Sequence, residues 1–224
     1  MRGLKGFTLA EVLITLGVIG IVAAMTLPPV INKYKEKQTI TQIKYALNIL
    51  NNAFRLAVAE HGDIKNWEYV DSLEEPAKRK LFIDKYLIPY VKGAKVSQQE
   101  SYDSNDLGYP STAPPKQPNG TITGMSSRTF YPITLLNGIF FYAASTDNNG
   151  NMTIDVDLNG TNPPNIFGYD LFVFILEQDK NSVYAVGHNY ENPMNSCTRG
   201  NAWSCAAAII KNEYTIPKNY PVKF

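Results

Sequence analysis

The feature that most constrains this chain is a long apolar run at its amino terminus. Residues 7–31 are 25 positions with a single charged side chain, Glu11. As a helix this run is about 37 Å long, which exceeds the roughly 30 Å hydrocarbon core of a bilayer. Two positive charges, Arg2 and Lys5, lie among the six residues before it. The run therefore predicts a membrane segment at one end of the protein.

Two ordinary interpretations of this segment leave Glu11 unexplained. One is a secretory signal, cleaved after a small residue within Val-Ala-Ala at positions 22–24. The other is a plain membrane anchor. A carboxylate at that depth costs roughly 2.5–3.5 kcal/mol on insertion scales, so we expect Glu11 to have a function.

Residues 5–14, Lys-Gly-Phe-Thr-Leu-Ala-Glu-Val-Leu-Ile, resemble the processing and methylation motif of type IV prepilins and type II secretion pseudopilins. The resemblance implies that residues 1–6 are a leader, cut off between Gly6 and Phe7 by a prepilin peptidase that also N-methylates Phe7. It implies that Glu11 pairs with the terminal amine of a neighbouring subunit.

The same resemblance implies where the protein works. Residues 7–31 would span the bacterial inner membrane once and later form the filament core, and residues 32–224 would lie in the periplasm and then in a pilus or pseudopilus. Loop charges alone do not fix this orientation, because lysines flank both ends of the run. The stem helix of the family often bends or melts near a proline, and here Pro28 is followed by Pro29.

Physical chemistry supports the role of Glu11 independently. A carboxylate in hydrocarbon needs a cationic partner, and residues 7–31 contain no Lys or Arg. Cleavage would create such a partner, the α-ammonium of Phe7, within one chain or between chains.

The remaining chain has the periodicity of a helix followed by strands. Apolar residues spaced by three and four predict an amphipathic helix over 32–61 that stops at Gly62: Ile40, Ile43, Leu47, Leu50, Phe54 and Val58. A second helix is predicted over 73–86, with a Ser72–Glu75 capping box. Four of its residues are expected to face inward: Leu81, Phe82, Lys85 and Tyr86.

Five strand-like runs follow a Pro- and Gly-rich segment, residues 101–128, which is predicted to be a surface loop. The runs are residues 130–136, 139–144, 152–158, 171–176 and 182–186. Short connections, including Asn137-Gly138, predict an antiparallel meander. A long helix on such a sheet is an α+β fold, similar to that of type IV pilins.

Composition and motifs argue against two classes of function. Lys and Arg number 21 and Asp and Glu number 20, so the near-neutral chain lacks the basic excess of a nucleic-acid-binding protein. Glu191 and Ser196 lie near His188 in sequence, but no nucleophile elbow, phosphate loop or dinucleotide fingerprint accompanies them. We therefore predict that the chain is not an enzyme.

A calcium site is one interpretation of residues 155–160, because Asp155, Asp157 and Asn159 match a D-x-D-x-N-G loop of alternating oxygen ligands. Major pseudopilins bind calcium as a class. The twelfth position is Ile166 where an EF-hand needs Glu, and Asp170 could replace it only if the loop folds back. In the alternative interpretation this is a strand end and turn, with both aspartates facing solvent.

Cys197 and Cys205 enclose seven residues. A disulfide suits an exported domain, pilins often close a carboxy-terminal loop in this way, and such a bridge contributes about 2.5 kcal/mol on the chain-entropy estimate. The rival interpretation is a pair of metal-binding thiols.

Two classes of function remain open at this point. The first is a structural subunit of a type IV filament or secretion pseudopilus, with prepilin peptidase and other pilin subunits as partners. The second is an exported adhesive or ligand-binding protein with a pilin-like or signal-peptide amino terminus.

Overall fold

The structure, a computed structural model, describes Gly6 and residues 8–96, 109, 111–122, 131–146, 149–199 and 202–224. It divides into two compact units, Met1–Gln38 with Phe224, and Thr39–Lys223. The helices are α1 (Leu9–His61), α2 (Pro76–Tyr86), α3 (Pro193–Arg199) and α4 (Cys205–Lys211). Four short 3-10 helices accompany them: Ile64–Asn66, Val70–Ser72, Ile88–Tyr90 and Gln178–Lys180.

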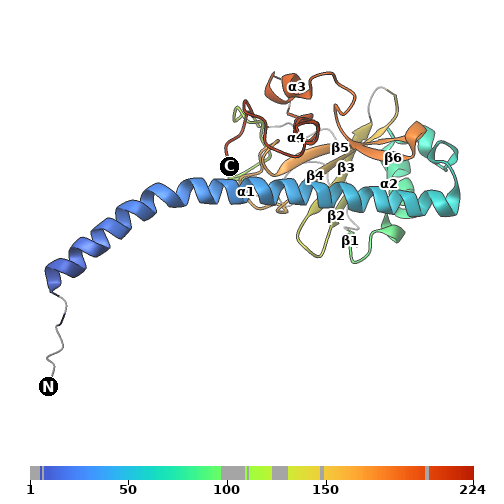
Figure 1. Cartoon of the computed structure of the whole chain (residues 1–224). Helices are drawn as coiled ribbons and strands as arrows, with labels where there is room; N and C mark the ends of the chain where they lie inside the picture. Colours follow the sequence, from blue (N-terminus) through green and yellow to red (C-terminus); the bar gives the residue numbers. More distant parts are fainter. Residues whose placement is uncertain are drawn as a thin grey trace. The chain divides into compact units, whose positions relative to one another are not determined.

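The described strands form one antiparallel sheet in which each strand pairs with the next along the chain. They are β1 (Lys95–Val96), β2 (Tyr131–Thr134), β3 (Phe140–Thr146), β4 (Met152–Asp157), β5 (Leu171–Glu177) and β6 (Ser182–Ala185). The predicted meander and the α+β pilin-like fold are therefore confirmed (Figure 1). Asn137-Gly138 makes the predicted hairpin turn, with Gly138 at φ +85° and the Leu135 N–H bonded to the Ile139 carbonyl at 2.8 Å.

From Thr39 onward α1 packs beside the sheet through a line of residues spaced by three and four (Figure 1). Its buried members are Thr39, Ile43, Ala46, Leu50, Ala53, Phe54 and Ala57. The predicted stripe was right at three positions, whereas Ile40, Leu47 and Val58 are only partly buried. The helix ends at His61, and Gly62 follows at φ +77° as predicted.

Asn51 joins this helix to the edge of the sheet. Its side-chain nitrogen donates to the Val183 carbonyl at 2.9 Å, and its side-chain oxygen accepts from the Val183 N–H at 2.9 Å. The amide thus occupies both outward-facing backbone groups of β6 at this position, as a neighbouring strand would. Capping of an edge in this way removes a potential site of strand addition.

The second helix differs from its prediction at the start and in its inward face. It begins at Pro76, with Glu75 as an N-cap that makes no side-chain capping bond, so the predicted Ser72–Glu75 capping box is wrong. Proline has a fixed φ suited to the first helical position, and that preference decides the start. Phe82 and Tyr86 are buried as predicted, but Leu81 is 46% exposed. Lys85 lies outside too, paired with Glu68 at 2.8 Å.

Both faces of the central strands are covered. All six residues of β4 are buried, and α4 packs against β5. The predicted loop 101–128 lies partly outside the described residues, but Tyr109 within it is 3% exposed and packs edge-on against Phe140. Part of this loop therefore covers the sheet.

Candidate functional site

The first turn of α1 holds Glu11 in a reciprocal cap. The backbone N–H and hydroxyl of Thr8 both donate to Glu11 Oε2 at 2.8 Å, and the Glu11 N–H donates to the Thr8 hydroxyl oxygen at 3.3 Å. Thr8 precedes the first helical residue, so Thr-x-x-Glu is a capping box. The sequence carried this signal at positions 8–11, and it was missed because Glu11 was interpreted through its charge.

The cap supplies Glu11 with uncharged hydrogen-bond donors, but it does not supply a positive charge to balance the carboxylate. In the single chain Thr8 satisfies one carboxylate oxygen, so a cationic partner remains necessary in an apolar environment. The mature amine of Phe7 would lie next to Thr8 in sequence. Phe7 itself lies outside the described residues.

Gly6 is exposed, and a side chain added to it would meet no atom within 4 Å. The fold therefore does not require a glycine at this position. A requirement for glycine at position 6 would therefore have to come from outside the folded chain, as for a residue that enters the active site of a processing enzyme.

The helix after Glu11 exposes apolar side chains on all sides. Its most apolar 18-residue window has a mean hydropathy of 2.2 and is 0% buried, so the helix is long and apolar enough to cross a membrane. Between Glu11 and Ile31, twelve large apolar residues are at least 40% exposed: Val12, Leu13, Ile14, Leu16, Val18, Ile19, Ile21, Val22, Met25, Leu27, Val30 and Ile31. Such a surface is stable only in lipid or against other apolar helices.

Pro28 and Pro29 lie inside α1, and the helix continues through both. The expected interruption is therefore absent from the single chain. Each proline removes one backbone donor, so the carbonyls of Ala24 and Met25 lose their usual helical partners. This leaves a weak point in a continuous helix.

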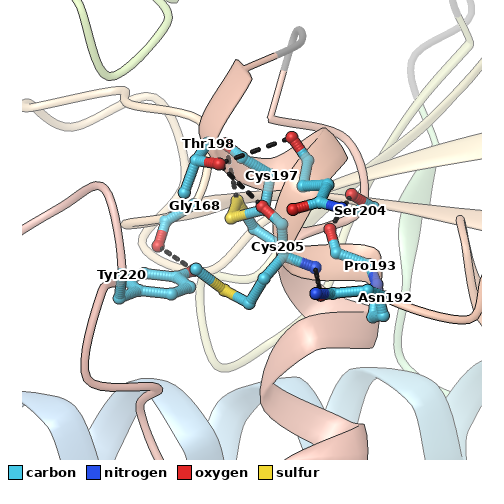
Figure 2. Close-up of a disulfide and its surroundings, with 10 residues drawn as sticks. Gly168, Asn192, Pro193, Cys197, Thr198, Ser204, Cys205 and Tyr220 are labelled. Carbon is cyan, nitrogen blue, oxygen red and sulfur yellow. Dashed lines mark hydrogen bonds between the residues drawn. A yellow bond between two sulfur atoms is a disulfide. The ribbon is translucent and has the colours of Figure 1, made fainter.

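The structure joins Cys197 to Cys205 in a disulfide, which rules out the metal-thiol alternative (Figure 2). Both cysteines are buried, at 1% and 0% exposure. The Ser204 hydroxyl donates to the Pro193 carbonyl at 2.8 Å inside the same turn. The bridge thus ties α3 to the start of α4.

The two aspartates of the calcium motif are buried in β4, so the interpretation in which they face solvent is wrong. Asp155 is 5% exposed and Asp157 is 0% exposed. Tyr109 donates its hydroxyl to Asp157 Oδ2 at 2.9 Å, and the Asn159 N–H donates to Asp157 Oδ1 at 3.1 Å. Burial, reinforced by the nearby carboxylate of Asp170, raises the pKa of Asp157 to about 8.

The loop after β4 does fold back and brings Asp170 to this cluster. Asp170 accepts from the backbone N–H groups of Asn165 and Ile166, and Asn159 Nδ2 approaches its Oδ2 at 3.4 Å. Burial raises the pKa of Asp170 to about 6 despite these bonds. Asn159 Oδ1 makes no hydrogen bond to the described residues, and carboxylate and amide oxygens suit a hard cation. Nevertheless, in the described part of the chain no three His, Cys, Asp or Glu side chains lie together as a metal site.

His188 has partners that sequence proximity did not predict. Its Nε2 lies 3.4 Å from Glu177 Oε1 and 3.4 Å from Lys180 Nζ, and its ring stacks on Tyr184 at 4.4 Å. Among the described residues these contacts replace the Glu191 and Ser196 neighbours noted in sequence. No hydrophobic periodicity signals this grouping, because it joins the end of β5 to the turn after β6.

The chain combines a prepilin cleavage motif, an apolar helix that follows it and an antiparallel sheet. This combination defines a pilin-like protein. Residues 1–27 match the prokaryotic N-terminal methylation motif, the signature of type IV pilins and pseudopilins. The chain belongs to the family described as a family of unknown function (DUF6613), which it matches over residues 29–224. Comparison with curated proteins and with solved structures finds no significant match.

Proposed function

We propose that the chain is a structural subunit, a pilin or pseudopilin, of a type IV filament or of a type II secretion pseudopilus. The observation that carries this proposal is the exposed apolar part of α1, residues 9–31, which belongs to a methylation motif at its start and contains one acid, Glu11. Lipid would cover this surface before assembly, and the same segments of neighbouring subunits would cover it afterwards.

In this role the chain is processed before it assembles. Prepilin peptidase removes residues 1–6 and methylates the new terminus, Phe7. Residues 7–31 span the inner membrane once, and residues 32–224 form the periplasmic domain. Glu11 then exchanges its neutral Thr8 donors for the terminal amine of a neighbouring subunit, and this pairing sets the axial position of the incoming chain.

The amino terminus of the mature protein tests the proposal. The full chain would be expressed in a host with a type IV or type II system, extracted from membranes and measured by intact-mass and amino-terminal fragment spectrometry. A chain that begins with N-methyl-Phe7 supports the subunit. A chain that begins near Met25 contradicts it and favours the second candidate, an exported adhesive or ligand-binding protein released by signal peptidase.

A further inference from the structure

A hollow of about 450 Å³ lies on the sheet within the unit Thr39–Lys223, which does not include the amino-terminal segment that the proposed assembly uses. Its floor comes from two paired strands. Thr153 of β4 and Ile175 of β5 lie opposite each other, and Glu177 is on the same face two residues further along β5. The volume is within the roughly 300–1,000 Å³ of small-molecule sites.

One wall of the hollow belongs to the connection between β3 and β4. Thr146, Asn149 and Asn151 line it with a hydroxyl and two side-chain amides. The Asn151 side-chain oxygen accepts from the Gln178 N–H at 3.2 Å, which fixes that amide at the end of β5.

A second wall of the hollow is aromatic, and its two residues shortly precede the carboxy-terminal helices in sequence. Tyr190 and Trp203 line it, and the sequence position of Trp203 is inside the loop that the Cys197–Cys205 disulfide closes. Lys211 of α4 donates its ammonium to the Tyr190 carbonyl. A covalent bridge and a hydrogen bond therefore hold the backbone that carries the two rings before any ligand arrives, and a preorganised backbone reduces the entropic cost of binding.

The charges at the hollow cancel. Burial lowers the pKa of His188, which leaves its imidazole neutral at pH 7. The carboxylate of Glu177 is paired with the ammonium of Lys180. Neither an anionic nor a cationic ligand would gain net attraction from these groups, so a neutral ligand fits best.

We propose that this hollow binds a neutral saccharide. Amide and hydroxyl side chains both donate and accept hydrogen bonds, which matches the hydroxyl groups of a sugar. Aromatic rings offer flat apolar surfaces with a polar edge, suited to the C–H face of a pyranose. The site lies wholly in the globular unit, so this proposal does not depend on the filament role.

Saturation-transfer-difference NMR on the full chain tests the site, in a detergent without a sugar head group. The probes are glucose, galactose, N-acetylglucosamine and lactose at millimolar concentration. We expect saturation transfer from the aromatic wall to the ring protons of at least one probe. The chain has two tryptophans, and Trp67 is 4% exposed, so a saccharide-dependent change in fluorescence would report Trp203 and would disappear in Trp203→Phe.

Three variants locate the binding. Tyr190→Ala and Asn189→Ala change exposed residues of the hollow, and each should weaken binding about tenfold while circular dichroism stays unchanged. Tyr45→Ala is the matched control, because Tyr45 and Tyr190 are both 47% exposed and Tyr45 lies on α1 outside the hollow. The proposal is overturned if no probe shows saturation transfer. It is also overturned if Tyr190→Ala and Asn189→Ala both bind as the parent and the Tyr45→Ala control do.

Discussion

The two ends of helix α1 place the same kind of side chain in opposite environments. Leu16 is 61% exposed, whereas Leu50 is 0% exposed against the sheet. Both ends of the helix carry apolar residues, but in a single chain only those of the carboxy-terminal end are covered by the rest of the fold. Residues 9–31 should therefore determine where the protein goes and what it joins, and Thr39–Lys223 should determine whether it folds. The predictions below perturb one region or the other and test this division.

The largest effect is expected from Gly6→Glu. A bulky charged side chain before the scissile bond should block cleavage by the peptidase almost completely. The fold has room for a side chain at position 6, so only the enzyme would require glycine there. Quantitative blotting of membranes should then show the uncleaved precursor, with the globular domain still folded. Gly3→Glu, the same change elsewhere in the leader, is the control. Normal processing of Gly6→Glu would refute the prepilin interpretation.

Substitution of Glu11 should impair assembly and leave folding intact. Glu11→Gln keeps an acceptor for the Thr8 cap and removes the charge, whereas Glu11→Val removes both. A charge pair coupled by on the order of 1–3 kcal/mol predicts that both variants enter sheared filaments about tenfold less than the parent. If Glu11→Gln assembles normally and Glu11→Val does not, the cap is what matters and the charge-pair account is wrong.

Leu50→Ala and Leu16→Ala make the same change at the two ends of one helix. Loss of the buried Leu50 side chain should lower the free energy of unfolding of the domain by about 2–5 kcal/mol. Leu16→Ala should leave that free energy unchanged, because its side chain is exposed in the single chain. Denaturant titration followed by circular dichroism measures both. Equal losses in the two variants would show that the two regions are not independent.

The Cys197–Cys205 bridge should stabilise the domain by about 2.5 kcal/mol through the smaller entropy of the unfolded chain. Cys205→Ser should lower the melting temperature by several degrees and reduce abundance in the cell envelope. The parent measured in reductant should show the same decrease, and the variant should not respond to reductant. A parent that melts identically with and without reductant would show that the bridge does not form in solution.

The last region to perturb is the cluster of buried carboxylates. The pKa of Asp157 is about 8 and that of Asp170 about 6 in the folded protein, both above the ordinary value of 3.8. The folded state therefore keeps protons that the unfolded chain releases, so stability should fall as pH rises from about 4 to 8. Asp157→Asn should flatten the dependence of melting temperature on pH between 5 and 8. Asp179→Asn, on the surface, is the control and should leave that dependence unchanged.

The same measurement of melting temperature, repeated with and without calcium, tests the predicted calcium site. An ion at Asp155, Asp157 and Asn159 would favour the ionised carboxylates, so millimolar calcium should raise the melting temperature at pH 8 and chelator should lower it. Asp157→Asn should abolish the difference. No binding by calorimetry at millimolar calcium would exclude the site.

Features that depend on neighbouring residues in the chain could be predicted from the sequence. The strand over Met152–Asp157, the turn at Asn137-Gly138 and the helix end before Gly62 each follow from local spacing and backbone preference. The apolar amino-terminal segment and its methylation motif are likewise local, and both could be predicted from the sequence, whereas the Thr8 cap was missed.

The class of protein, its apolar amino-terminal segment and the order of its central strands therefore follow from local sequence. Which side chains lose water depends instead on how distant segments pack. Asp155 and Asp157 alternate along β4 as surface residues would, yet a covered second face buries them. Asn51 contacts Val183 across 132 positions of sequence. The residues that line the hollow likewise come from separate segments of the chain, from Thr146 to Trp203. Burial depends on contacts between distant segments, and a period of two or of 3.6 residues carries no information about them.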